Sequence, residues 1–217
     1  MIVDSMTHEE VYVELERDRD SVTRWWRHQL DDLRRPMLKR RTFPYHVWRE
    51  YTSPRRNRYL FFSRIFDKRM KAILTGIAVI RRTSDGTTIY TNWLADQKLI
   101  APMVLIPHMW KRYAERTGTD KTGLELIKHY FQNNPHGKDS HDQNVVGRSV
   151  RYNGEEHLAN CVTEGVLLGQ QQGDIFVVKT FITYDMCCGR QQEECECCRK
   201  DVLTDRELYD EAVRFYH

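Results

Sequence analysis

The sequence predicts an α+β protein: a mostly antiparallel sheet of about five strands packed on helices, with N-terminal helices and a C-terminal Cys-rich helical tail. Five stretches are rich in β-branched and aromatic residues, as strands are, and others carry apolar residues at the helical period. The 217 residues are 40% hydrophobic and 30% charged, which is typical of a soluble protein. The longest strongly apolar run, residues 73–80, is too short to cross a bilayer, so no membrane partner is expected.

Two helices are expected at the N-terminus. Thr7 and Glu10 form a T-x-x-E capping box, a pattern in which both side chains satisfy backbone N–H groups of the first turn. Ser21 is the expected cap of a second helix over residues 22–35, whose inner side carries apolar residues at helical spacing. Pro36 is expected to end or kink that helix, because proline lacks the backbone N–H that helical bonding requires.

A basic connection and three strands are expected next. Residues 38–57 are basic and rich in turn-forming residues, which indicates a loop or a short helix around residues 45–51. The strands are expected at residues 58–66, 71–82 and 87–94. The Asp85-Gly86 pair between the last two is typical of a hairpin turn.

The second half of the chain is expected to add two helices and a strand hairpin. Pro107 suits the first turn of a helix that extends to about residue 117, and a second helix is expected over residues 121–133. The polar segment 134–156 is expected to be a loop or flap. Two strands, residues 163–172 and 174–185, should follow, and the second, which is the richest in β-branched and aromatic residues, is expected at the centre of the sheet.

We expect one α+β domain over residues 1–186, followed by a Cys-rich turn and a helix in residues 187–217. The first three strands have no helical layer of their own that could cover both faces, which favours one domain over two. Thr204 is the expected cap of the last helix. The expected parts of the domain are the N-terminal helices (1–36), a three-strand meander (58–94), a helical pair (104–134) and the strand hairpin (163–185).

Positive charge is concentrated in residues 21–82. This stretch holds 17 of the 34 lysines and arginines but only 4 of the 31 aspartates and glutamates. Aromatic residues are interleaved with these charges, namely Trp25, Trp26, Phe43, Tyr45, Trp48, Tyr51, Tyr59, Phe61 and Phe62. Basic and aromatic side chains together bind nucleic-acid backbones and stack on bases.

We therefore expect a nucleic-acid partner, RNA more than DNA. The residues predicted to contact it are Arg40, Arg41, Arg55, Arg56 and Arg58. An acidic protein partner is the alternative, because a basic surface attracts any acidic macromolecule. A third interpretation is that the aromatic residues form the core while the charged ones only face water.

The predicted helix IPHMWKRYAER, residues 106–116, places His108, Arg112 and Arg116 one turn apart. Such a row can grip a phosphate and transfer a proton, because imidazole titrates near neutral pH and guanidinium groups bind phosphate with two hydrogen bonds. The alternative is an ordinary amphipathic helix, with Met109 and Trp110 packed on a sheet and the charged side chains in water.

Five of the six cysteines lie between Cys187 and Cys198. Cys188, Cys195 and Cys198 are candidate ligands of a structural zinc ion, since thiolates meet its tetrahedral demand. Free surface thiols or a redox pair are the alternatives. The N-terminal residues lack the features of a signal peptide, so we expect a cytoplasmic protein without disulfides.

The order of motifs in residues 104–185 resembles the toxin-type ribonucleases of the RelE, barnase and EndoU superfamily in bacteria and phages. The motifs are a helix with H-x-x-x-R-x-x-x-R, a second helix, G-V-L-L-G and a strand that ends in KTFITYD. Met109 stands where those relatives have a small residue, and the N-terminal half of this chain has no counterpart in them.

The resemblance implies a sheet that cradles RNA and side chains that cleave it without a metal or other cofactor, with the ribose 2′-OH as the nucleophile. His108 would be the general base or acid, and Arg112 and Arg116 would hold the phosphate. Lys179 or Tyr184, on the last strand, would be the second proton-transfer group. The alternative is an accessory protein of a phage or mobile element that binds nucleic acid or protein without catalysis.

Overall fold

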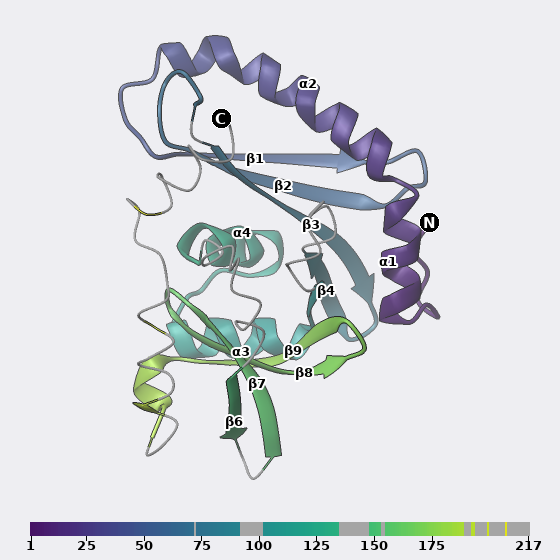
Figure 1. The fold of residues 1–217 in the computed structure, drawn as a ribbon, viewed down its shortest axis with the longest axis vertical. Helices are drawn as coiled ribbons and strands as arrows, with labels where there is room; N and C mark the ends of the chain where they lie inside the picture. Colours follow the sequence, from purple (N-terminus) through teal and green to yellow (C-terminus); the bar gives the residue numbers. More distant parts are fainter. Residues whose placement is uncertain are drawn as a thin grey trace. The chain divides into compact units, whose positions relative to one another are not determined.

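The computed structural model describes residues 1–71, 73–91, 102–134, 148–152 and 155–188, together with residues 192, 193, 199 and 207. The chain forms two compact units, one built on Met1–Arg81 and the other on Arg82–Leu203. The described residues contain four α-helices and nine strands (Figure 1). The α+β class is confirmed, but the expectation of about five strands is too low.

The first unit combines two helices with an antiparallel sheet of strand order β1-β2-β3. Its elements are α1 (His8–Glu16), α2 (Arg19–Leu38), β1 (Tyr45–Thr52), β2 (Arg58–Ile65) and β3 (Ile73–Thr83). Figure 1 shows α2 extended along β1 and β2. β1 is an edge strand of this unit, since β2 is the one strand that pairs with it in the described part of the chain.

Aromatic packing attaches α2 to the sheet. Phe61 of β2 is fully buried, and its ring lies 4.8 Å from that of Trp26 and 5.0 Å from that of Trp25. Further along the helix, Leu33 and Met37 pack with Val47, Ile65, Met70 and Ile73. The apolar spacing that predicts the helix therefore also marks its buried side.

The N-terminal helices confirm one cap and correct another. Thr7 and Glu10 form both hydrogen bonds of the capping box before α1. Helix α2 begins at Arg19 and not at residue 22, and the Ser21 hydroxyl donates to the Asp18 carbonyl instead of capping the helix. Pro36 lies inside α2, which continues to Leu38, so one missing hydrogen bond in the last turn does not end the helix.

The expectation of a loop or short helix in residues 38–57 is wrong, because β1 pairs with β2 over eight residues. The sequence of β1 does not show the alternation of apolar and polar residues that is typical of a strand. Val47 is buried, whereas Arg49 on the same face is exposed at the edge of the sheet. An edge strand can carry charged residues where a central strand requires apolar ones. The apolar alternation of an edge strand is therefore weaker.

The second unit contains a sheet of strand order β4-β5-β9-β8-β7-β6. Its strands are β4 (Gly86–Thr91), β5 (Met103–Leu105), β6 (Arg148–Tyr152), β7 (Glu155–Val162), β8 (Gly165–Gln172) and β9 (Ile175–Ile182). β5 and β9 are parallel, and the other described pairs in this unit are antiparallel. The segment 134–156, expected to be a loop, contains β6 and the start of β7.

Helix α3 (Pro107–Thr117) packs on β9, and helix α4 (Gly123–Asn133) packs on α3. Tyr113 of α3 packs edge-on against Phe181 of β9 at 5.1 Å between ring centroids. Tyr130 of α4 meets Tyr113 and Trp110 at 5.1 and 5.3 Å. The predicted apolar side of the 106–116 segment is therefore confirmed as a packing surface.

Lys179 is an extra residue in β9. The register pairs Leu168 with Thr180 and Gly169 with Val178, so β8 has no residue opposite Lys179. Gly169 is required at this bulge because a Cβ atom there would lie 2.1 Å from the Val177 carbonyl oxygen.

No helix in the described part of the chain is long and apolar enough to span a bilayer.

The substitution Gly169→Ala should lower the free energy of unfolding by about 1–3 kcal/mol, because the added methyl group must displace the backbone of β9. Urea denaturation followed by circular dichroism measures the change. Gln171→Ala, at an exposed position two residues later in β8, is the control and should change stability by less than about 0.5 kcal/mol. Equal effects of the two substitutions would contradict this account of the bulge.

Candidate functional site

His108 and Arg112 form an exposed pair on α3. The Nε atom of Arg112 donates to Nε2 of His108 at 3.4 Å, and its guanidinium also forms an ion pair of 2.9 Å with Glu115. The predicted spacing of one helical turn therefore does bring these two side chains together. Their surroundings are open, since His108 is exposed and 41% of the Arg112 side chain is accessible.

Arg116, the third member of the row, is engaged in holding the fold. Its guanidinium donates to the carbonyl oxygen of Phe181 and contacts the Thr180 hydroxyl at 3.4 Å. β5 pairs with β9 only over residues 176–178, so these acceptors lie beyond the point where β5 ends. Arg116 thus takes over a hydrogen bond that a longer β5 would provide, which occupies the group predicted to hold phosphate.

Lys179 and Tyr184 have separate partners in another part of the unit. The Lys179 ammonium donates to Oε1 of Gln170 at 2.5 Å, and the Tyr184 hydroxyl donates to the Val162 carbonyl at 2.7 Å. The Tyr184 ring packs against a cluster formed by Ala159, Cys161, Val166, Leu168, Ile182 and Cys187. The guanidinium of Arg199 lies 4.9 Å from its centre.

The two groups of candidate catalytic residues lie on opposite faces of the sheet. Side chains alternate along a strand, so Gln170 shares a face with Leu168, whereas Leu167 points to the other face. Leu167 is paired with Phe181, on which α3 packs. The structure therefore joins His108 with Arg112 but does not bring Lys179 or Tyr184 to them.

A polar junction around Glu164 has no counterpart among the predicted residues. Its carboxylate accepts hydrogen bonds from the Tyr113 hydroxyl at 2.5 Å, Asn133 at 2.9 Å and Asn134 at 2.8 Å, and its backbone N–H donates to Asn134 at 2.9 Å. Burial, together with the hydrogen bond to Glu164, raises the pKa of Tyr113. The junction fixes the β7–β8 turn to both helices, and every carboxylate oxygen is occupied.

The cysteine predictions are only partly within the described residues. Cys187 is buried and Cys188 is exposed, while Cys195 and Cys198 lie outside the described residues. Among the residues that the structure describes, no three histidine, cysteine or acidic side chains are grouped to hold a metal ion. Cys161 is disulfide-bonded, so the expectation of no disulfide, which rested only on compartment, is wrong at this position.

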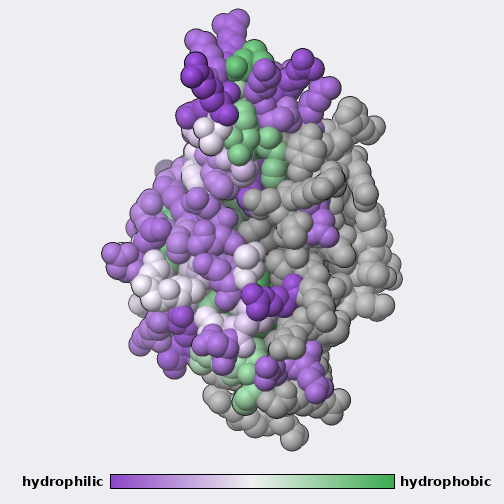
Figure 2. Space-filling view, turned by 90° about the vertical axis from the view of Figure 1, so that its left-hand side faces the viewer, coloured by the Kyte–Doolittle hydropathy of each residue, from purple (hydrophilic) through white to green (hydrophobic). Residues whose placement is uncertain are grey.

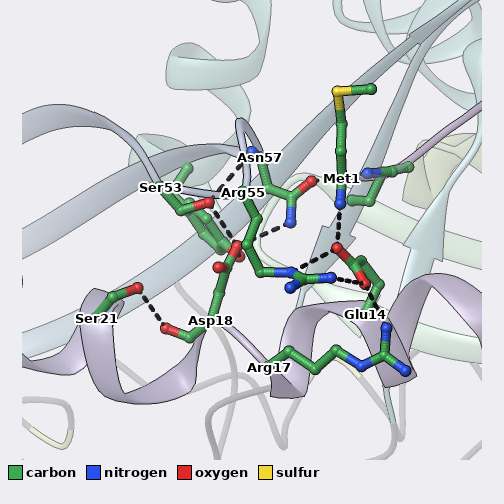
Figure 3. Close-up of polar contacts among 10 residues, drawn as sticks. Met1, Glu14, Arg17, Asp18, Ser21, Ser53, Arg55 and Asn57 are labelled. Carbon is green, nitrogen blue, oxygen red and sulfur yellow. Dashed lines mark hydrogen bonds and ion pairs between the residues drawn. The ribbon is translucent and has the colours of Figure 1, made fainter.

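Arg55, a predicted nucleic-acid contact, instead binds a buried carboxylate in the first unit. It donates two hydrogen bonds of 2.8 Å to Glu14, whose side chain is only 3% exposed (Figure 3). The amino group of Met1 also bonds to this carboxylate, and Arg17 lies 3.1 Å from it. The hydrogen bonds from Arg55 lower the pKa of Glu14 to about 2, despite the opposing effect of burial.

A second buried carboxylate, Asp18, lies at the junction of α1 and α2. Its Oδ2 atom accepts hydrogen bonds from Ser53 at 2.6 Å, Asn57 at 2.8 Å and Tyr59 at 2.7 Å. Burial and this contact raise the pKa of Tyr59. Figure 3 shows how Asp18 and Glu14 together hold the β1–β2 turn against the helices.

The other four predicted arginines divide between the two ends of β1. Arg40 and Arg41 precede the strand, whereas Arg56 and Arg58 follow it. Eight residues of strand span roughly 25 Å, so the two pairs do not form one compact patch. Arg58 is partly neutralised by Glu50 at 3.5 Å, while Arg41 and Arg56 are exposed.

We define the β1 edge surface as Trp25, Arg40, Tyr45, Arg49 and Tyr51. The rings of Trp25 and Tyr51 are stacked, with centroids 4.7 Å apart and planes 19° apart. The Arg40 guanidinium lies 4.0 Å from the centre of the Tyr45 ring. All three aromatic side chains are partly buried, and both arginines are exposed. Arg49 was not among the predicted contacts, because residues 45–51 were not expected to form a strand.

The rest of the described surface exposes few large hydrophobic side chains. The large hydrophobic side chains that are exposed there are Met1, Val3, Val13, Leu38 and Met186. Figure 2 shows one face of the molecule, on which hydrophilic residues prevail and hydrophobic ones form small patches.

The pairing of Glu14 predicts a specific loss of stability in acid. A carboxylate with a lowered pKa in the folded state stabilises the fold above its ordinary value of 4.5, and this contribution disappears as the pH falls toward 2. Over this pH range the free energy of unfolding of the wild-type protein should fall by about 3 kcal/mol more than that of Glu14→Gln. Denaturant titrations at several pH values measure the difference.

Glu16→Gln is the matched control, because the Glu16 side chain is 51% exposed and pairs with Arg19 at the surface. Its pH dependence should follow the wild type. If Glu14→Gln and Glu16→Gln behave alike, the buried ion pair does not stabilise the unit as described.

The chain matches no protein-family model, and neither a curated protein nor a solved structure shows detectable similarity to it.

Proposed function

We propose that the protein binds nucleic acid, RNA in preference to DNA, through the first unit. The observation that carries the proposal is the β1 edge surface, on which the exposed Arg40 and Arg49 lie beside partly buried aromatic rings. Within the described residues no carboxylate pairs with Arg41, Arg49 or Arg56, so their charges are available to phosphates. The excess of positive charge in residues 21–82 adds a positive electrostatic potential that attracts a polyanion from a distance.

Binding without cleavage is the version of this function that the geometry favours. Metal-independent RNA cleavage needs a base, an acid and cationic groups around one phosphate. Here His108 and Arg112 form an open surface pair, Arg116 bonds to the backbone, and Lys179 lies on the other sheet face. Ribonuclease activity at His108 remains the alternative, and it rests on the resemblance of residues 104–185 to toxin-type ribonucleases.

The binding proposal predicts an affinity for RNA that falls steeply with salt. The double variant Arg41→Gln/Arg49→Gln should bind a fluorescein-labelled 12-nucleotide RNA about tenfold more weakly at 100 mM salt. The slope of log K against log salt should become shallower by about 1.4, since each lost phosphate contact on a single strand removes about 0.7. Fluorescence anisotropy over a salt series measures both quantities.

Arg34→Gln is the control, because Arg34 is already paired with Asp31 on α2. It should change affinity less than twofold. Polyglutamate of equal charge tests the alternative of an acidic protein partner. If polyglutamate displaces the RNA as well as unlabelled RNA does, the surface recognises general negative charge and the proposal fails.

The cleavage alternative has its own test. The purified protein, incubated with the same RNA, should leave it intact on a denaturing gel, and His108→Ala should bind RNA like the wild type. Cleavage by the wild type that disappears in His108→Ala would instead establish the ribonuclease.

A further inference from the structure

We infer that the β1 edge surface takes single-stranded nucleic acid, with bases stacked on Tyr51 and Tyr45 and a phosphate held by Arg49 between them. The inference rests on the proposed function and adds the substrate class and the residues that would select it. It follows from the alternation of side chains along β1, because Tyr45, Arg49 and Tyr51 all lie on the face that carries Val47. Leu33 and Met37 of α2 cover Val47 itself, so the nucleic-acid strand would lie along the outer side of β1, where Arg49 is exposed, and not across the middle of the sheet face.

The Tyr51 end of the surface is rigid. Tyr51 is stacked on Trp25, and Trp25 in turn packs at 5.0 Å against Phe61, which is fully buried. Tyr51 also contacts Tyr59 at 6.1 Å, and Tyr59 is fixed by its hydrogen bond to Asp18. A base that stacks here meets rings that are already ordered, so little conformational entropy is lost on binding.

The Tyr45 end already holds a planar cation on an aromatic face. The Arg40 guanidinium lies 4.0 Å from the ring centre and also donates to the Tyr45 hydroxyl at 2.8 Å. Guanidinium planes and aromatic rings both stack on nucleic-acid bases. This pair can therefore receive a base on the exposed side of Arg40 or in place of it.

The position of Arg49 sets the spacing of the surface. Arg49 is exposed, and its one hydrogen bond in the described residues is to the neighbouring Trp48 carbonyl at 2.9 Å. The six residue steps from Tyr45 to Tyr51 span roughly 20 Å of strand. An extended strand of about four nucleotides covers this length, with its backbone near Arg49.

A duplex does not fit this arrangement. Its bases are stacked on one another and present only their edges, so aromatic side chains cannot reach their faces without unstacking them. The acidic side chains nearby do not oppose a single strand at the centre of the surface. Glu50, the one acidic residue of β1, points to the other face of the strand and pairs with Arg58.

Anisotropy measurements on the full chain test the inference, using a labelled 12-nucleotide oligouridylate and an RNA duplex of the same length. The single strand should bind at least tenfold more tightly than the duplex. Tyr51→Leu should weaken binding of the single strand about tenfold, the effect of one lost stacking contact, and leave duplex binding unchanged.

Trp48→Leu is the matched control, because Trp48 is also an aromatic residue of β1 but lies on the opposite face of the strand. Its ring centre is 5.6 Å from that of Phe62. It should change affinity for the single strand less than twofold. Circular dichroism confirms that each variant folds, and Tyr45→Leu provides the same test at the other end if Tyr51→Leu does not fold.

The outcomes separate the inference from the proposed function. If neither the single strand nor the duplex binds, the proposed function fails and the inference with it. If both bind equally, or if Tyr51→Leu and Trp48→Leu weaken binding alike, the protein binds nucleic acid but not by stacking at this surface, and the inference alone is overturned.

Discussion

Two buried carboxylates, Glu14 and Asp18, hold the first unit together, and its other features depend on them. Glu14 binds both the N-terminal amino group and Arg55, while Asp18 gathers Ser53, Asn57 and Tyr59. Breaking a buried charged contact by removing one partner is costly, because the remaining charge has no water to replace it. These contacts fix the β1–β2 turn, and with it the position of β1 beside α2.

The same contacts decide which positive charges remain for a partner. Arg55 is occupied by Glu14 and Arg116 by the backbone of β9, so neither can serve as a phosphate contact without a loss of structure. Arg41, Arg49 and Arg56 carry no comparable interaction within the described residues. A basic sequence therefore does not locate a binding site by itself. The arginines that form ion pairs or backbone hydrogen bonds within the fold must first be distinguished from those that are exposed.

Strong periodic patterns predict much of this fold, and weak ones do not. Helix α3, the α1 capping box and strands β2, β3, β4, β8 and β9 follow from the sequence, since burial on one side imposes a clear period. Strand β1 is an edge strand with charged residues, and β5 has only three residues, so neither shows such a period.

The contact of His108 with Arg112 could be predicted from helical spacing. The stacking of Trp25 on Tyr51 could not, because it joins two elements far apart in the sequence.

Hydrogen–deuterium exchange of the full chain, with and without a saturating single-stranded RNA, tests the central claim most directly. Among the described residues, the backbone N–H groups on the edge of β1 that faces away from β2 have no strand partner, so bound RNA should slow their exchange. The account predicts slower exchange in residues 45–52 and in the adjoining part of α2, residues 22–29, with no change in residues 107–117. Slower exchange confined to residues 107–117, with β1 unaffected, would contradict it and place the nucleic-acid site on α3.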